Sequence, residues 1–240
     1  MNPTPSPLPP TEPFTFWNED CVTGARARLP DGCVDLVLTD PPYGIEGDTL
    51  DKHYHRKEGN VVPGYVDVPA ADYARFSLDW ISEAVRVTRP NGTIHIISGW
   101  TRLGAVLNAI EQINARAGGK GAVETVNHVI WQYNFGVFTT RKFVSSHYHI
   151  LMLRKLKRRG ETGEAVFNYG SRERLPLLLA DPARAETLTK ILYADLQDVW
   201  RIKRQYRPGE PKNRNRLPDA LVDKLLAYSC LLYTSPSPRD

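Results

Sequence analysis

The stretch Val34-Asp-Leu-Val-Leu-Thr-Asp40-Pro-Pro-Tyr43 decides the fold class of this chain. Its first six residues are mostly aliphatic or β-branched, which is typical of a strand covered on both faces in a mainly parallel sheet. Outward from this stretch, strand-like and helix-like segments alternate. Such alternation predicts an α/β sheet.

The sequence pattern predicts the flanking elements by residue range. Strands are expected at Phe14–Trp17, Thr93–Ser98, Val123–Tyr133 and Tyr148–Leu153, and helices from Asp20 to Leu29 and at Ala70–Thr88, Leu103–Ala117 and Leu217–Tyr228. Residues 44–64 are polar and predict a loop, and residues 154–190 interrupt the alternation with charge and proline, as an insert would.

The four residues that directly follow the first strand carry the strongest functional signal. Ligands of open α/β sheets bind at the carboxyl ends of strands. Asp40 supplies a carboxylate and Pro41, stiffened by Pro42, a carbonyl, so both can accept hydrogen bonds from an exocyclic amine of adenine or cytosine. Tyr43 offers a face on which a flipped base can stack. The alternative is a strand-ending turn without a catalytic role.

Composition and charge restrict the class of protein. The 240 residues are 41% hydrophobic and 24% charged, as in a soluble domain, and no run reaches the ~18 apolar residues that span a bilayer. Three cysteines without a Cys-x-x-Cys pair suit a reducing cytosol. Residues 14–140 carry 11 basic and 15 acidic side chains, whereas residues 141–216 carry 18 and 8. This basic part favours a polyanionic partner, the alternative being a solvated face.

Further segments complete a pattern of landmarks. Before the first strand stand Asn18-Glu-Asp20-Cys21 and Leu29-Pro-Asp-Gly-Cys33; after it follow Asn91-Gly-Thr-Ile94, His147-Tyr-His-Ile-Leu151, Asp198-Val-Trp-Arg-Ile202 and Lys212-Asn-Arg-Asn-Arg-Leu-Pro218. In this order, over about residues 14–229, they resemble amino-directed DNA methyltransferases. The resemblance is to the subgroup in which the Asp-Pro-Pro-Tyr motif precedes the target-recognition region and the glycine-rich cofactor motif comes last.

The resemblance implies a Rossmann-like methyltransferase sheet, mostly parallel with one antiparallel hairpin strand, and incomplete at the C-terminus. It implies methyl transfer from S-adenosylmethionine to the exocyclic amine of a flipped base in double-stranded DNA. Adenine N6 is favoured over cytosine N4 because Asp rather than Ser heads the motif. Asp20, Cys21, Asp40, Ser98 and Pro218 are implied to lie near the cofactor, and a cognate restriction endonuclease and the oligomeric state stay open.

The sequence departs from this family pattern in two places. Asn213-Arg-Asn-Arg216 stands where many relatives carry a His-Pro-Thr-Gln-Lys-like run, and the glycine-rich cofactor motif is missing where it should follow Ser229. A catalytically inactive DNA-binding fragment is therefore the alternative to an active enzyme. A cytoplasmic protein of bacterial or phage origin is expected.

The two ends are expected to lie outside the catalytic domain. Residues 1–13 hold six prolines, which predicts an extended, disordered arm. Residues 230–240 match a translated sequencing-library adapter at all eleven positions, so the natural sequence is expected to end near Ser229. The catalytic domain then spans residues 14–229, with 154–190 as a candidate target-recognition region.

Basic side chains give candidate DNA contacts. By resemblance, Arg141 and Lys142 contact the phosphate backbone, and the run at 154–159 predicts a DNA-facing patch or a solvated face. The predicted DNA-binding residues are Lys52, Arg56, Lys57, Arg141, Lys142, Arg154, Lys155, Lys157, Arg158 and Arg159.

Other conspicuous residues are interpreted as structural. His53-x-His55 and His147-x-His149 lack companions at metal-ligand spacing, so no metal is expected. Trp80, Trp100, Trp131 and Trp200 are predicted to be core residues. Cys21 is expected to pack rather than act as a nucleophile, and the absence of a Pro-Cys pair argues against methylation at cytosine C5.

Overall fold

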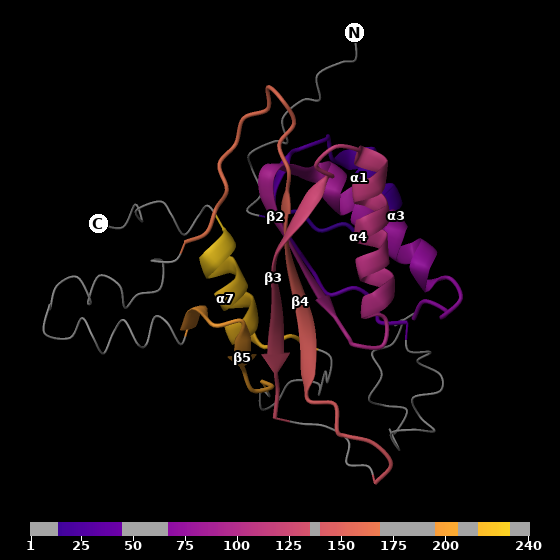
Figure 1. Ribbon diagram of the computed structural model, residues 1–240, viewed down its shortest axis with the longest axis vertical. Coiled ribbons are helices and arrows are strands. Elements are labelled where there is room, and N and C mark those ends of the chain that lie inside the picture. The colour runs from indigo at the N-terminus through magenta and orange to yellow at the C-terminus, as the bar shows by residue number, and fades with distance from the viewer. Residues whose placement is uncertain (1–13, 45–66, 135–139, 169–194, 206–215, 231–240) are drawn as a thin grey trace, which may run out of the picture.

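The computed structural model describes residues 14–44, 67–134, 140–168, 195–205 and 216–230, which form a five-stranded sheet between helices (Figure 1). The strands are β1 (Val34–Thr39), β2 (Thr88–Ser98), β3 (Val123–Gln132), β4 (His147–Lys155) and β5 (Val199–Arg201). The helices are α1 (Cys21–Arg28), α3 (Tyr73–Val87), α4 (Leu103–Ala117) and α7 (Asp219–Ser229). No helix among these residues is long and apolar enough to cross a membrane.

The strand order is β1-β2-β4-β3-β5. β1 pairs parallel with β2, and β3 pairs parallel with β5, while β4 is antiparallel to both of its neighbours. Every strand except β4 therefore runs in the same direction. The expected mostly parallel sheet with one antiparallel hairpin strand is confirmed.

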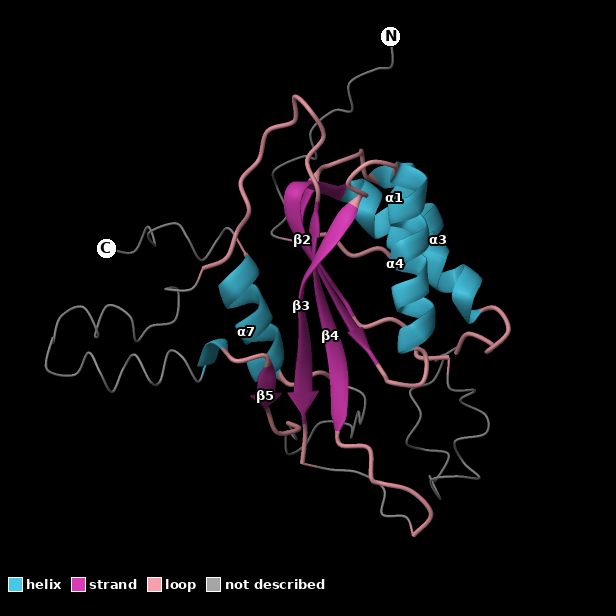
Figure 2. Cartoon of the chain, in the orientation of Figure 1, coloured by secondary structure: helices cyan, strands magenta, loops and turns pink. Residues whose placement is uncertain are grey.

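Helices cover both faces of the sheet (Figure 2). α3 and α4 pack on one face, where Ile94 and Ile96 of β2 belong to a cluster with Ile81 and Ile110. On the other face, Leu221 and Leu225 of α7 are buried in a second cluster. This cluster includes Ile97, the residue after Ile96 in β2, and residues of β3 and β4. Because successive strand residues point to opposite faces, the buried residues at the end of β2 contribute to both cores.

The helix boundaries follow local sequence signals. In α3 the buried positions Tyr73, Ser77, Trp80, Ile81 and Ala84 recur at helical spacing and form one face. The chain leaves the helix at Thr88, two residues before a proline, which cannot continue a helix.

Two local expectations were wrong, and one strand was missed. Phe14–Trp17 forms no strand, and Phe14 and Phe16 are about four-fifths exposed. Trp100 is 57% exposed and is not a core residue, because it follows β2 beyond the part of the sheet that the helices cover. β5 was not expected, since three residues are too few to show a strand period.

Several predicted segments lie outside the described residues. They include the Pro-rich arm, nearly all of the 44–64 loop, the greater part of the 154–190 insert, and residues 231–240. β2 begins at Thr88, five residues before the expected strand, and includes Asn91, which takes a positive φ of 59° where the register with β1 shifts.

Candidate active site

The turn Asp40–Tyr43 leaves β1 at the carboxyl edge of the sheet. Because β1, β2 and β3 run in the same direction, the residues that follow them gather at this edge. They are Asp40 after β1, Gly99 and Trp100 after β2, and the β3–β4 connection, which includes Arg141 and Lys142. Open α/β sheets bind ligands at such an edge.

Asp40 and Tyr43 form a hydrogen-bonded pair within the turn. The Tyr43 hydroxyl donates a hydrogen bond to Oδ1 of Asp40. Desolvation by the surrounding chain raises the pKa of Asp40 to about 6, and the Tyr43 hydrogen bond opposes this shift. Part of the Asp40 residue stays exposed to solvent, so its carboxyl is crowded but accessible. A carboxyl with this pKa is mostly ionised at pH 7 and can accept a hydrogen bond from a ligand.

The two prolines of the turn differ in what their carbonyls do. The Pro42 carbonyl accepts a hydrogen bond of 2.8 Å from the hydroxyl of Tyr73. The Pro41 carbonyl has no hydrogen-bond partner within the described part of the chain. Pro41 is itself buried and carries a carbonyl that the described part of the chain leaves without a partner.

An aromatic wall extends from Tyr43 across the sheet. The Tyr43 ring stacks on Tyr148 of β4 with centroids 5.4 Å apart, and Tyr148 lies 5.4 Å from Trp131 and 5.1 Å from Tyr133. At Gly99 an added Cβ would make ordinary van der Waals contact, at 3.9 Å, with both Tyr43 and Tyr148, so this glycine lies directly beside the pair. In the sequence, Tyr148 was noted only as part of the His147–Leu151 segment that resembles the family, and its contact with Tyr43 was not predicted. Its position in β4, next to the apolar Ile150, gave no signal of this contact.

Asp20 and Cys21 lie at the start of α1 rather than in the turn. The Asp20 carboxylate accepts a hydrogen bond of 2.9 Å from the Thr23 N–H, which caps the helix and lowers the pKa of Asp20. Cys21 is exposed, so the expectation that it packs was wrong: α1 buries Gly24 instead. Partial desolvation of the thiol, and next the charge of Asp20, raise the pKa of Cys21. The thiol therefore stays protonated near neutral pH, which is unlike a cysteine nucleophile.

Ser98 and Pro218 both lie close to the carboxyl edge. Ser98 is 1% exposed at the end of β2, and its hydroxyl donates to the Gly99 carbonyl at 3.1 Å. Pro218 is buried at the start of α7, where its carbonyl accepts from the Leu221 N–H at 3.0 Å. Its neighbour Leu217 shares a cluster with Leu38 of β1. The structure therefore brings Ser98 and Pro218 to the end of the sheet that bears Asp40.

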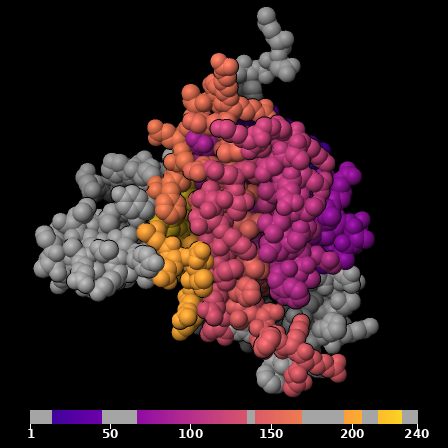
Figure 3. Space-filling model, in the orientation of Figure 1, coloured from indigo at the N-terminus to yellow at the C-terminus, as the bar shows by residue number. Residues whose placement is uncertain are grey.

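The predicted DNA-binding residues divide between the two ends of the sheet. Arg141 and Lys142 are exposed in the β3–β4 connection at the Asp40 end, where Phe143 is 99% exposed. Arg154 to Arg159 lie at the opposite end, because β4 is antiparallel and Arg154 pairs with Thr93 at the far end of β2 from Ser98. Figure 3 shows residues 154–168, in orange, along the upper edge of the molecule. Lys52, Arg56 and Lys57 are outside the described residues.

Two members of the 154–159 run make internal contacts. Arg154 pairs with Glu124 of β3. The Lys155 ammonium donates to the carbonyls of Thr88 at 2.6 Å and Arg86 at 3.1 Å, and burial lowers its pKa. Lys157, Arg158 and Arg159 are exposed.

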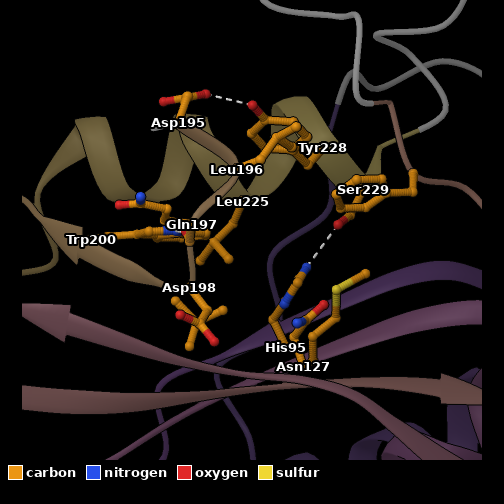
Figure 4. A pocket seen from close by; sticks show the side chains of 13 residues that line it. His95, Asn127, Asp195, Leu196, Gln197, Asp198, Trp200, Leu225, Tyr228 and Ser229 are labelled. Carbon is orange, nitrogen blue, oxygen red and sulfur yellow. Dashed lines mark hydrogen bonds between the residues drawn. The ribbon is translucent and has the colours of Figure 1, made fainter. Parts of the chain in front are cut away.

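A separate hollow of about 460 Å³, partly open to solvent, lies on the α7 face of the sheet (Figure 4). In it His95 is 3% exposed, and its Nε2 shares a hydrogen bond of 2.8 Å with the Ser229 hydroxyl. Burial lowers the pKa of His95 to about 4, so the imidazole is neutral. No residue predicted for the site lines this hollow, so we assign the candidate site to the Asp40 turn.

Histidines gather on the other face of the sheet, near the Asp40 end. His128 and His149 share a hydrogen bond of 2.8 Å, and burial lowers the pKa of His149 to about 4. Within the described ranges, no group of three or more His, Cys, Asp or Glu side chains is arranged to hold a metal ion.

Comparison with known sequences finds one family. The family model for N6/N4 DNA methylases matches residues 34–232. A curated relative, the type II methyltransferase M.HpaI of Haemophilus parainfluenzae, is 29% identical over 131 residues, which are 55% of this chain and 36% of that protein. The chain thus matches only about a third of that relative's length.

Comparison with solved structures supports the fold. A candidate DNA modification methylase from Thermus thermophilus, complexed with S-adenosyl-L-methionine, superposes with a TM-score of 0.51 at 16% identity, covering 87% of this chain and 71% of that one. The cytosine-N4-specific PvuII DNA methyltransferase gives a TM-score of 0.55 at 10% identity, covering 88% and 68%. At such low identity these likenesses concern the arrangement of the sheet.

Proposed function

Because the chain belongs to the N6/N4 DNA methylase family, we propose that it methylates an exocyclic amine of a base in double-stranded DNA, with adenine N6 favoured. The observation that carries the proposal is the Asp40 carboxyl, crowded yet accessible beside the Pro41 carbonyl, which has no partner among the described residues. Two acceptors in one turn suit an amine that has two N–H groups to donate.

The first step of the proposed mechanism is an exchange of hydrogen bonds at Asp40. In the structure the Tyr43 hydroxyl donates to Asp40. An incoming base amine would replace that hydroxyl as donor to the carboxylate and would donate its second hydrogen to the Pro41 carbonyl. Both bonds favour a tetrahedral nitrogen, because they draw its hydrogens out of the plane of the base. The freed Tyr43 ring stays near the base as a stacking surface.

We propose S-adenosylmethionine as the methyl donor. When bound, it supplies an electrophilic methyl group: a nitrogen–carbon bond forms, the sulfur–carbon bond breaks, and the amine loses a proton to solvent. The residues at the edge fit such a molecule, because Gly99 places no side chain beside the Tyr43–Tyr148 pair and the carboxyl of Asp40 can accept hydrogen bonds from polar groups. Asp20, Cys21, Ser98 and Pro218 are proposed to line the same site.

We further propose that Arg141 and Lys142 hold the phosphate backbone at the Asp40 edge. They are exposed there and carry the charge that DNA binding requires. Similarity to a type II methyltransferase is the reason to test for a cognate restriction endonuclease as a partner.

The test is methyl transfer from labelled S-adenosylmethionine to unmethylated duplex DNA, followed by digestion of the product and mass spectrometry of the nucleosides. We expect N6-methyladenine; N4-methylcytosine would correct the target base. Asp40→Ala should abolish transfer and leave DNA affinity nearly unchanged, since phosphate contacts dominate affinity. Activity of Asp40→Ala within threefold of the wild type would overturn the role of Asp40. DNA binding without transfer by the wild type would favour an inactive DNA-binding chain.

A further inference from the structure

Three backbone polar groups at the end of the Asp40 turn are held from outside it. The Pro42 carbonyl accepts from the Tyr73 hydroxyl at 2.8 Å, and the Gly44 N–H donates to Oδ1 of Asp67 at 2.9 Å. The Gly44 carbonyl accepts from Nε of Arg102 at 3.0 Å. The partners come from three separate segments: Asp67 precedes α3, Tyr73 begins it, and Arg102 precedes α4.

Tyr73 is the rigid member of this clamp, which we define as Tyr73, Asp67 and Arg102. Its side chain is 1% exposed, and its ring packs against Phe76 at a centroid distance of 5.7 Å. Gly44 has a φ of 61°, and a Cβ there would lie 2.3 Å from the Tyr73 ring. Only glycine allows the backbone to pass this close to the ring in this conformation.

The clamp determines which carbonyl the turn can offer. With the Pro42 carbonyl bound to Tyr73 and the Gly44 carbonyl bound to Arg102, the Pro41 carbonyl, next to Asp40, stays without a partner in the described part of the chain. A turn released from Tyr73 could rotate its peptide units and so change the orientation of the Pro41 carbonyl relative to the Asp40 carboxylate.

We infer that Tyr73, supported by Asp67 and Arg102, is a positioning residue that aims the Asp40 carboxylate and the Pro41 carbonyl at a single amine. This inference rests on the proposed function. Tyr73 acts through the Pro42 carbonyl and does not touch the base. Misplacement of reacting groups by about 1 Å is enough to slow a reaction strongly.

The test compares two substitutions that each remove one buried hydroxyl. Tyr73→Phe deletes the donor to Pro42, and Tyr228→Phe deletes the donor to Asp195 on the α7 face of the sheet. We expect Tyr73→Phe to lower kcat for methyl transfer at least about tenfold, with KM for DNA within twofold of the wild type. Tyr228→Phe should leave both constants within twofold. Equal losses of kcat in the two variants, or none in Tyr73→Phe, would overturn the inference.

A second measurement does not depend on activity. The pH titration of the Asp40 carboxyl, followed by carbon-13 NMR, should have its midpoint near pH 6 in the wild type and in Tyr228→Phe. In Tyr73→Phe we expect the midpoint to move down, because a loosened turn admits water to the carboxyl. An unchanged midpoint would overturn the clamp. Wild-type protein that methylates no DNA would instead overturn the proposed function. The NMR titration of Asp40 would still test the clamp, because it does not require methyl transfer.

Arg102→Met repeats the test from outside the core, for the case that Tyr73→Phe does not fold. Methionine keeps an unbranched side chain but cannot donate to the Gly44 carbonyl. The same loss of kcat and the same downward shift of the Asp40 titration are expected. A variant that matches the wild type in both measurements would remove Arg102 from the clamp.

Discussion

Asp40 is the residue on which the chemistry depends, and its protonation state determines what it can do. The ionised carboxyl only accepts hydrogen bonds, whereas the protonated form donates one and so loses an acceptor site. Desolvation raises its pKa to about 6, against the hydrogen bond from Tyr43. The free protein therefore passes from the competent to the incompetent form as pH falls through this value.

This gives a first prediction, on the pH dependence of activity. Below about pH 6, kcat/KM for methyl transfer should fall roughly tenfold per pH unit, because it reports ionisation of the free enzyme. A pH–rate profile from pH 5 to 8 measures it, with DNA affinity at each pH as the control. A profile that stays flat down to pH 5 would contradict the pKa assigned to Asp40.

His95 gives a second prediction, on stability. Its pKa is about 4 in the folded protein and near 6.5 when unfolded, so the unfolded chain binds more protons between these values. Stability should therefore fall as pH drops from about 6.5 to about 4, by about 3 kcal/mol in total. Urea unfolding at pH 7 and pH 4.5 should show this loss in the wild type and a smaller one in His95→Gln. Equal losses of stability in the wild type and in His95→Gln would show that groups other than His95 cause the pH dependence.

At the scale of elements, the β3–β4 connection exposes an aromatic side chain at the edge that bears Asp40. Phe143 is 99% exposed and directly follows Arg141 and Lys142. Basic residues next to an apolar wedge are suited to a duplex whose bases are being unstacked. Exposure of this degree contributes nothing to the fold, so a change at Phe143 should leave stability unaltered.

The corresponding prediction concerns base extrusion. Phe143→Ala should slow methylation of a fully paired duplex, and a mismatch at the target base, which lowers the cost of extrusion, should restore most of the rate. Phe167→Ala, at an exposed phenylalanine on the α7 side, is the matched control. It should methylate the paired and the mismatched duplex at the rates of the wild type. A Phe143→Ala defect of equal size on both duplexes would contradict a wedge.

At the scale of the whole molecule, basic clusters lie at both ends of the sheet. Arg141 and Lys142 are at the Asp40 end, and Lys157, Arg158 and Arg159 are exposed at the other. The nine residues of β4 separate them. At 3.4 Å per residue this is roughly 31 Å, less than one turn of duplex DNA. A duplex lying along the sheet could contact both clusters.

Salt dependence separates the two clusters. Each phosphate contact that is lost should reduce the slope of log affinity against log salt by about 0.9. Neutralising Arg141 and Lys142 should therefore reduce the slope by up to about 1.8, and neutralising Lys157, Arg158 and Arg159 by up to about 2.7. Titrations at four salt concentrations measure both variants. An unchanged slope for either would identify that cluster as a solvated surface.

Local sequence patterns were enough to predict the sheet type and the position of its functional turn. The apolar run before Asp40 and the helical period of residues 73–87 are local patterns, which the structure follows at β1 and α3. A strand that ends in Asp-Pro-Pro-Tyr must place these residues at the carboxyl edge, whatever the rest of the chain does. The bounds of α4 were also predictable, because the stretch with helical spacing is long and glycines directly follow it.

Which side chains contact the turn at that edge could be seen only in the folded chain. Tyr148 against Tyr43, and Tyr73 against Pro42, join residues more than 30 positions apart, and no local period encodes such contacts. The exposure of Trp100 and the pairing of the three-residue β5 depend likewise on where the neighbouring elements end. Burial and hydrogen bonding depend on the assembled surroundings of a residue, and sequence pattern reports only its neighbours along the chain.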